Sequence, residues 1–222
     1  YSKASGGRAG TMAGLKMATA TMKAMYRPTS SRPGIRAPEY MSPTERPSWS
    51  ARTISTSEGG TACAHPAEVA AHCEVIVSVV VNAAQTEAVL FGDGGAAAAL
   101  KPGSLFVMCS TVDPNWSVGL EARLAERGLL YLDAPISGGA AKAASGQMTM
   151  MTAGTAAAYA KAGGALDAMA AKVYKLGDRA GNGSKVKIIN QLLAGVHIAA
   201  AAEAMAMTET RSNRSTRGVA AR

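Results

Sequence analysis

The sequence predicts an α/β fold built on a doubly wound sheet, and three observations lead to this prediction. Residues 74–81 (EVIVSVVV) form a continuous β-branched run, typical of a central parallel strand that is covered on both faces. From residue 59 onward, strand-like and helix-like segments alternate, which favours right-handed crossovers within one sheet. Aromatic residues make up only 5% of the 222 residues, which indicates a core rich in Ala, Gly and Val.

Apolar runs and turn residues place the individual elements. Further strands are expected at residues 104–109, 129–132, 147–152 and 172–176. Helices are expected at residues 66–72, 83–91, 96–100, 115–127, 156–171 and 184–207. Pro66 suits the first turn of its helix, where a missing N–H costs nothing. Pro102 and Gly103 end the short helix before them, and Gly128 serves as the C-cap of the helix at 115–127.

Residues 1–58 differ from everything that follows. They are dense in Ser, Thr, Arg and Pro, and they show no strand-like apolar run. Because such a segment buries too little apolar surface to offset its ordering entropy, we expect it to be mostly irregular, with one short helix candidate at 12–25. The expected organisation is an atypical stretch at 1–58, an α/β domain at 59–180, a long helix at 181–207 and a polar tail at 208–222.

The net charge of +8 is concentrated at the two ends of the chain. Residues 1–58 hold nine basic and three acidic residues, and residues 207–222 hold four and one. Residues 59–206 hold ten basic and eleven acidic residues, so this part is close to neutral and no nucleic-acid partner is expected for it. A non-catalytic module whose basic ends bind nucleic acid stays open as an alternative, although the ends lack interleaved aromatic residues.

The remaining composition indicates a cytoplasmic protein. The longest apolar stretch, Ile188–Met207, contains Asn190, Gln191, His197 and Glu203, so we expect a buried helix and not a membrane span. The first residues lack the charged, apolar and small-residue pattern of a signal peptide. The three cysteines are odd in number and lie near apolar stretches, which indicates reduced thiols. The three histidines show no metal-ligand spacing, so no metal site is expected.

A Ser-Gly-Gly sequence follows the strand expected at 129–132. It consists of Ser137, Gly138 and Gly139. Glycines let backbone N–H groups approach a ligand closely, and the serine adds a hydroxyl, so this segment is a candidate cradle for an anion. An ordinary turn between a strand and a loop would explain the same residues.

A lysine stands in the first turns of the helix expected at 184–207. This residue, Lys187, follows a turn with two glycines, and Gln191 lies four residues further on the same face, with Asn190 beside it. Burial would lower the pKa of this lysine and suit it to donating or accepting a proton. The alternative is a lysine exposed to solvent.

Two polar residues end the strand expected at 104–109. Ser110 and Thr111 stand where nucleotides bind in open α/β sheets. An ordinary helix start before Asn115 is the alternative. Residues 92–97 (GDGGAA) formally match a dinucleotide-binding glycine pattern, but they follow a helix instead of a strand and are rejected.

Taken in order, these motifs resemble the β-hydroxyacid dehydrogenase family, which includes 3-hydroxyisobutyrate and tartronate semialdehyde dehydrogenases. The resemblance rests on DAPISGG with GQMTMMTAG, on CST and on GNGSKVKIINQ, and it covers about residues 59–207. It implies a Rossmann-like fold followed by the start of an all-α domain. It also implies NAD-dependent oxidation of a small 3-hydroxyacid, with NADP as the alternative cofactor. An NADP-dependent imine reductase is the alternative function, against which Lys187 argues.

The resemblance also implies a role for each candidate residue. Lys187 would be the general acid and base. The substrate carboxylate would be held by Ser137, Gly138 and Gly139, with further hydrogen bonds to the substrate from Asn190 and Gln191. The cofactor would be contacted by Val81, Asn82, Ser110 and Thr111.

Both ends depart from the family pattern. Residues 1–58 lack the glycine-rich loop that holds the dinucleotide, and an Arg/Ser/Thr-rich tail follows residue 207 in place of a helical domain. These departures predict that both ends are read out of frame. We therefore expect weak activity or none from the 222-residue chain, and a homo-oligomer only where the helical domain is complete.

Overall fold

The computed structural model describes residues 17–21 and 63–219, with side chains from residue 63 to residue 208. Its strands are β1 (Met17–Thr21), β2 (Val75–Val79), β3 (Leu105–Met108), β4 (Leu130–Asp133), β5 (Ile136–Ser137), β6 (Met148–Thr152) and β7 (Ala170–Lys175). Its α-helices are α1 (Pro66–His72), α2 (Ala83–Phe91), α3 (Pro114–Ala125), α4 (Gly139–Ala144), α5 (Ala156–Met169) and α6 (Asn182–Val219). A short 3-10 helix, η1, covers Ala96–Ala98.

Four parallel strands form the main sheet, in the order β1-β2-β3-β4. Their register sets Val75 of β2 beside Leu105 of β3, and Leu105 beside Leu130 of β4. A smaller sheet follows, in which β5 pairs antiparallel with β6, and β6 pairs parallel with β7. The two sheets meet at a β-bridge between Asp133 and Ala153, whose peptide groups exchange hydrogen bonds of 3.0 and 2.8 Å.

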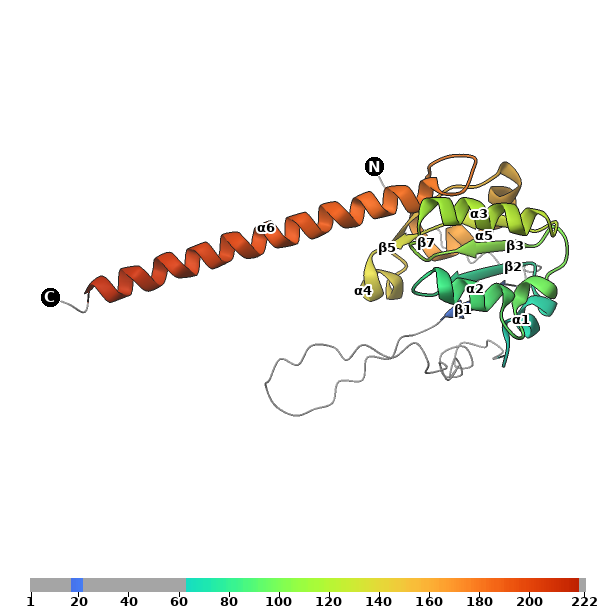
Figure 1. Ribbon diagram of the computed structural model, residues 1–222, viewed down its shortest axis with the longest axis horizontal. Coiled ribbons are helices and arrows are strands. Elements are labelled where there is room, and N and C mark those ends of the chain that lie inside the picture. Colours follow the sequence, from blue (N-terminus) through green and yellow to red (C-terminus); the bar gives the residue numbers. More distant parts are fainter. Residues whose placement is uncertain (1–16, 22–62, 220–222) are drawn as a thin grey trace, which may run out of the picture.

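Side chains along β2 alternate between two separate cores. Ile76 belongs to the core under α1, α2 and α3, whereas Val75 and Val77 belong to the core under α5. This period of two is the reason that one buried strand needs helices on both faces. Figure 1 shows α1, α2 and α3 on the near side of the sheet and α5 behind it. The predicted doubly wound α/β fold is therefore confirmed.

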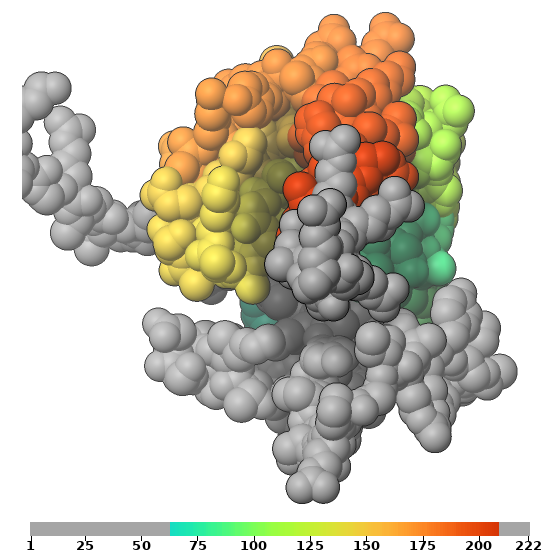
Figure 2. Space-filling model, turned by 90° about the vertical axis from the view of Figure 1, so that its left-hand side faces the viewer, coloured from blue at the N-terminus to red at the C-terminus, as the bar shows by residue number. Residues whose placement is uncertain are grey.

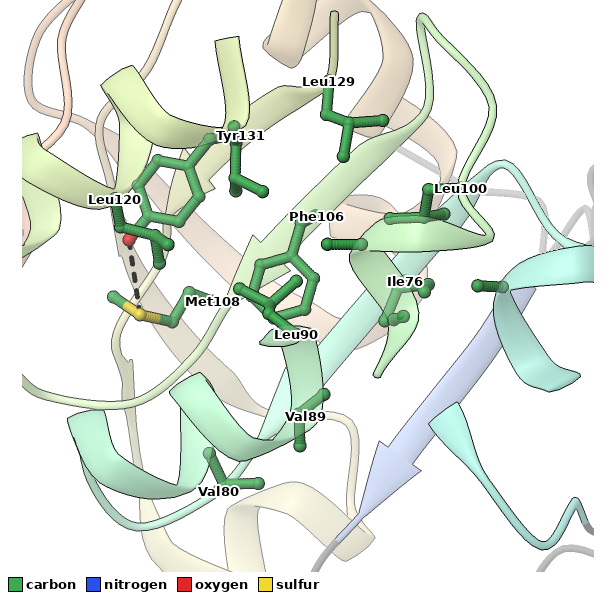
Figure 3. Close-up of a cluster of buried hydrophobic side chains, with 14 of the residues drawn as sticks. Ile76, Val80, Val89, Leu90, Leu100, Phe106, Met108, Leu120, Leu129 and Tyr131 are labelled. Atoms are coloured by element: carbon green, nitrogen blue, oxygen red, sulfur yellow. Dashed lines mark hydrogen bonds between the residues drawn. The ribbon is translucent and has the colours of Figure 1, made fainter. Parts of the chain in front are cut away.

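The core under α1, α2 and α3 contains one buried polar cluster. Tyr131 of β4 is 2% exposed, and its hydroxyl lies 2.9 Å from the Ser117 hydroxyl on α3. The same hydroxyl donates to the Met108 sulfur at 3.3 Å, as the dashed line in Figure 3 shows. Burial raises the pKa of Tyr131 well above its usual range, so this phenol stays neutral. Strands β3 and β4 are thus tied to α3 by a satisfied polar contact.

The structure corrects the sequence predictions in four places. Residues 17–21 form a strand, β1, whereas the sequence suggested only a short helix candidate there. Strand β1 forms by parallel pairing with β2, and no apolar pattern in its own sequence predicts this pairing. Ser137 ends a two-residue strand and Gly139 begins a short helix, where a loop was expected. Helix α6 continues to Val219 through the segment expected to be a polar tail.

The fourth correction concerns the apolar face of α6. A buried helix was expected, but α6 projects away from the α/β domain in Figure 1, and Leu192 and Ile198 are 66% and 71% exposed. Within the described residues, Asn182–Thr208 is also long and apolar enough to cross a membrane, with a mean hydropathy of 1.3 and none of its most apolar window buried. One such helix is weak evidence for a membrane span.

Candidate active site

The carboxyl ends of the parallel strands meet at one edge of the main sheet. The register aligns Ser78 of β2 with Met108 of β3, and Met108 with Asp133 of β4. The segments that follow each strand therefore leave from the same edge, where ligands bind in open α/β sheets. Val81, in the loop after β2, is 63% exposed there, and Thr111, after β3, is half-buried.

Internal hydrogen bonds shape the predicted cofactor loops. Ser110 is buried, and its hydroxyl donates to the Val80 carbonyl at 2.8 Å, which ties the end of β3 to the end of β2. The side chain of Asn82 caps α2 by accepting from Gln85 N–H at 2.9 Å. Gln85 Oε1 in turn accepts from Val81 N–H at 2.8 Å, so two reciprocal hydrogen bonds connect Gln85 to the residues just before α2.

The N-termini of the helices at this edge indicate whether a dinucleotide could bind there. A pyrophosphate binds best to free N–H groups at a helix N-terminus. Asn82 caps one amide of the first turn of α2, that of Gln85, and Asp113 caps two amides of α3 by accepting from Asn115 and Trp116 at 2.9 and 3.1 Å. The start of α3, with two of its first amides capped and Pro114 at its first position, is a poor cradle for a pyrophosphate, and the start of α2 has one of its first amides capped.

A buried carboxylate anchors the first turn of α6 to β4. One oxygen of Asp133, Oδ2, accepts from the N–H groups of Gly181 and Ser184, each at 2.9 Å. The other oxygen, Oδ1, accepts from the Ser184 hydroxyl at 2.7 Å. Burial raises the pKa of Asp133, and these hydrogen bonds oppose that increase. The Asp133 carboxylate faces the N-terminus of α6, which is the positive end of the helix dipole.

Two glycines allow α6 to approach the sheet so closely. A Cβ atom on Gly183 would lie 2.5 Å from the Met151 carbonyl oxygen and 3.0 Å from that of Asp133. Gly181 has φ +95°, and a Cβ atom there would lie 3.0 Å from the Pro114 carbonyl oxygen at the start of α3. Since α3 begins shortly after Thr111, the start of α6 lies at the carboxyl edge of the sheet.

Lys187 lies in the second turn of α6 and is only 9% exposed. Burial lowers the pKa of its amine from the ordinary lysine value. The alternative of a solvent-exposed lysine therefore does not hold for this residue. Asn190 and Gln191, one turn further along, are exposed because α6 has by then left the domain. Among the residues with described side chains, no hydrogen bond joins either of them to the predicted anion cradle.

The predicted anion cradle lies in the segment between β5 and α4. Ser137 is half-buried and pairs with Thr149 of β6, whereas Gly138 and Gly139 are exposed. Both glycines have positive φ angles, 135° and 66°, which favour glycine over any other residue. Figures 1 and 2 show α4 and α6 on the same side of the molecule. No hydrogen bond joins the cradle to α6 within the described residues, so its role as a substrate site stays a prediction.

Sequence reasoning missed two acidic residues beneath α6. Asp133 is fully buried, and Glu121 of α3 accepts from Ala180 N–H at 3.2 Å while its other oxygen, Oε1, is buried without a partner. Burial raises the pKa of Glu121, and the nearby Asp133 charge adds to this effect. An aspartate directly after an apolar strand was a signal for Asp133. Glu121 sits in α3 close to the charged residues Arg123, Glu126 and Arg127, and this setting gave no such signal.

The fold and the site define a Rossmann-like dinucleotide-binding domain, in which a helix that carries a buried lysine begins at the carboxyl edge of the sheet. Comparison with known proteins refines this class. The chain belongs to the family described as the NAD binding domain of 6-phosphogluconate dehydrogenase, whose model matches residues 46–177. This is the NAD-binding domain of the β-hydroxyacid dehydrogenases, so the predicted resemblance is confirmed. The match begins upstream of the boundary expected at residue 59.

Individual relatives are more specific. L-threonate dehydrogenase of Cupriavidus necator is 64% identical over 149 residues, which cover 67% of this chain and 50% of the relative. The stretches VVVNAAQTEAVLFG and VKIINQLLAGVHIAAAAEAMA favour the same branch. A crystal structure of 3-hydroxyisobutyrate dehydrogenase from Salmonella typhimurium is 49% identical with a TM-score of 0.65, and covers 68% of this chain and 53% of that one.

A second solved structure gives a similar match. The Mycobacterium tuberculosis 3-hydroxyisobutyrate dehydrogenase with L-serine is 27% identical with a TM-score of 0.64, and covers 70% of this chain and 52% of that one. The chain therefore spans about half the length of the curated relatives and solved structures that it matches.

Proposed function

We propose that this chain forms the acid/base part of an NAD-dependent dehydrogenase that oxidises a small 3-hydroxyacid of the L-threonate type. The observation that carries the proposal is the burial of Lys187 beside the carboxyl edge of the parallel sheet. The similarity to L-threonate dehydrogenase of C. necator supports the choice of substrate, because the relative's name states that activity.

Lys187 would act as the general base of the oxidation. A desolvated amine loses its proton at a lower pH, so more of it is neutral near pH 7 and able to accept the hydroxyl proton of the substrate. In the reverse reaction the ammonium form would return that proton to the carbonyl oxygen. When bound, NAD supplies the acceptor for the hydride that leaves the same carbon atom.

The substrate carboxylate would bind at Ser137, Gly138 and Gly139. Because glycine has no side chain, the N–H groups of these two residues are not shielded by a Cβ atom. Gly138 could not carry one, because a Cβ atom would lie 2.7 Å from Lys142 Cβ. Asn190 and Gln191 would contact the substrate from α6, where both are exposed. These two segments lie on the same side of the molecule, as Figure 2 shows.

The cofactor would lie along the carboxyl edge, with NAD as the first choice and NADP as the alternative. Val81 and Thr111 border the edge directly, whereas Asn82 and Ser110 would act mainly by fixing the two loops through their internal hydrogen bonds. The pyrophosphate would need donors other than the capped amides of Gln85, Asn115 and Trp116.

We further propose that α6 opens a helical domain that completes the site and the subunit contact. The chain spans half of its relatives, and α6 presents an exposed apolar stripe of residues spaced three and four apart: Ile189, Leu192, Leu193 and Val196. Such a stripe is typical of a helix that packs against other helices.

Two lysines on α6 provide a matched test of the proposed function. Lys185 is exposed, whereas Lys187 is buried two residues later. NADH formation from NAD and L-threonate is measured for the 222-residue chain at high protein concentration, alone and with the second half of the C. necator relative supplied separately. We expect slow turnover in the wild type and in Lys185→Ala, and a loss of about 100-fold or more in Lys187→Ala.

Two results would contradict the proposal. One is equal activity in Lys187→Ala and Lys185→Ala, which would remove Lys187 from the chemistry. The other is the absence of L-threonate-dependent NADH from every mixture, including the mixture that contains the second half of the relative.

A further inference from the structure

Three hydrogen bonds that the Asp133 carboxylate accepts hold the segment that leads into Lys187. They connect the carboxyl end of β4 to the turn at Gly181 and to Ser184, and Ser184 lies one turn before Lys187 on α6. Asp133 itself is fully buried, and its own peptide group is fixed by two hydrogen bonds to Ala153. The anchor is therefore rigid on the strand side.

A second carboxylate supports the same turn. Glu121 of α3 accepts from Ala180 N–H at 3.2 Å, next to the Gly181 N–H that Asp133 binds. Beyond Lys187, the side chains of α6 are exposed up to residue 208. The position of Lys187 thus depends on the few contacts at the beginning of its helix.

We propose that Asp133 is a positioning residue, which fixes the first turn of α6 on β4 and thereby places the Lys187 amine at the carboxyl edge of the sheet. This inference rests on the proposed role of Lys187 as the acid/base group. Asp133 does not itself reach the reacting atoms in this account. It acts as a set of hydrogen-bond acceptors in a fixed position.

The acceptor geometry distinguishes this role from a purely electrostatic one. In Asp133→Asn, the amide oxygen can accept from both Gly181 and Ser184 N–H groups, and the amide nitrogen can donate to the Ser184 hydroxyl. Asp133→Ala removes all three bonds. A positioning role therefore predicts that Asn preserves the placement of Lys187 and Ala does not, whereas a role of the charge predicts the same change in both.

The test uses the pKa of the Lys187 amine, measured by NMR in the 222-residue chain and assigned by the loss of its signal in Lys187→Arg. In Asp133→Ala we expect this pKa to rise toward that of a free lysine, because the amine becomes hydrated. We also expect amide exchange at Gly181 and Ser184 to accelerate by about tenfold or more. Asp133→Asn should resemble the wild type in both measurements.

A second pair of variants keeps the test valid where Asp133→Ala does not fold. Gly183→Ala leaves Asp133 intact but pushes α6 off the strands, since its Cβ atom would lie 2.5 Å from the Met151 carbonyl oxygen. Gly195→Ala is the matched control on the same helix, because a Cβ atom there meets no atom within 4 Å. We expect the pKa of Lys187 to rise in the first variant and to stay unchanged in the second.

The outcomes separate this inference from the proposed function, because none of these measurements needs turnover. An unchanged Lys187 pKa in Asp133→Ala and in Gly183→Ala, or equal shifts in Asp133→Ala and Asp133→Asn, would overturn the positioning role. If the pKa shifts follow expectation while the wild type oxidises no hydroxyacid, the proposed function fails and the anchoring of α6 stands.

Discussion

Lys187 differs from its neighbours on α6 in one physical property, its burial. Lys185 and Gln191 lie within one turn of it and are exposed, whereas Lys187 is 9% exposed at the point where α6 still touches the α/β domain. Spacing along a helix shows which residues share a face, but not where the helix leaves its neighbours. The sequence therefore identified the candidate lysine and left its environment open.

The carboxyl group of Glu121, which accepts a hydrogen bond from the turn before α6, is partly buried at a cost in free energy. One of its oxygens is buried without a partner, and burial raises the pKa of the carboxyl group. Because the folded state then holds this proton to a higher pH than the unfolded chain, the contribution of Glu121 to the free energy of unfolding should fall as the pH rises from the ordinary glutamate range toward neutrality.

Glu121→Gln should remove this contribution to the pH dependence, because the glutamine carries no charge at any pH. The free energy of unfolding, measured by denaturant titration at several pH values, is expected to vary less with pH in Glu121→Gln than in the wild type. Glu126→Gln is the control, since Glu126 is exposed at the end of the same helix. Equal pH dependence in both variants would show that the burial of Glu121 has no energetic effect.

At the scale of elements, capping and turn residues were the most reliable signals. The expected bounds of α1 and α2 are those of the structure, and Pro66 and Asn82 stand at their starts. β1 was not predicted, because Met17–Thr21 carries no continuous apolar run and becomes a strand only by pairing with β2. The bounds of α6 were wrong at residue 207, since side-chain polarity alone does not end a helix.

The apolar stripe of α6 gives a prediction about association. Leu192→Glu combined with Val196→Glu should reduce concentration-dependent association in analytical ultracentrifugation, because both side chains are more than half exposed. The free energy of unfolding should change by only about 0.5 kcal/mol, as for other exposed positions.

The matched control places the same two charges on the opposite side of the helix. Ala194→Glu combined with Ala201→Glu should leave association unchanged, since these exposed alanines lie away from the stripe. Association that both pairs weaken equally, or that neither affects, would contradict a specific packing role for the stripe.

At the scale of the whole molecule, the order of strands and helices was predictable and the meeting of distant segments was not. The β-branched run at β2 and the alternation after it indicated a doubly wound sheet, and the two cores on either side of β2 confirm it. The contact between β4 and the start of α6 joins residues that are 51 positions apart, at Asp133 and Ser184. No local pattern specifies a hydrogen bond over that separation.

The same long-range contact explains the position of the candidate site. Asp133, Glu121 and the glycines before α6 together place the start of this helix at the edge where β2, β3 and their loops end. The sequence motifs provide the candidate chemical groups, and the start of α6, where Lys187 is buried, packs against α3, β4 and β6.

The most direct test of the central claim is the pH dependence of L-threonate oxidation, measured as NADH formation from NAD. Only the neutral amine of Lys187 can accept the hydroxyl proton, so the rate should rise with pH and level off above the pKa of this amine. Because burial lowers that pKa, the plateau should begin below the pH at which an ordinary lysine titrates. A rate that rises only in the ordinary lysine range, or the same profile in Lys187→Ala, would contradict the claim.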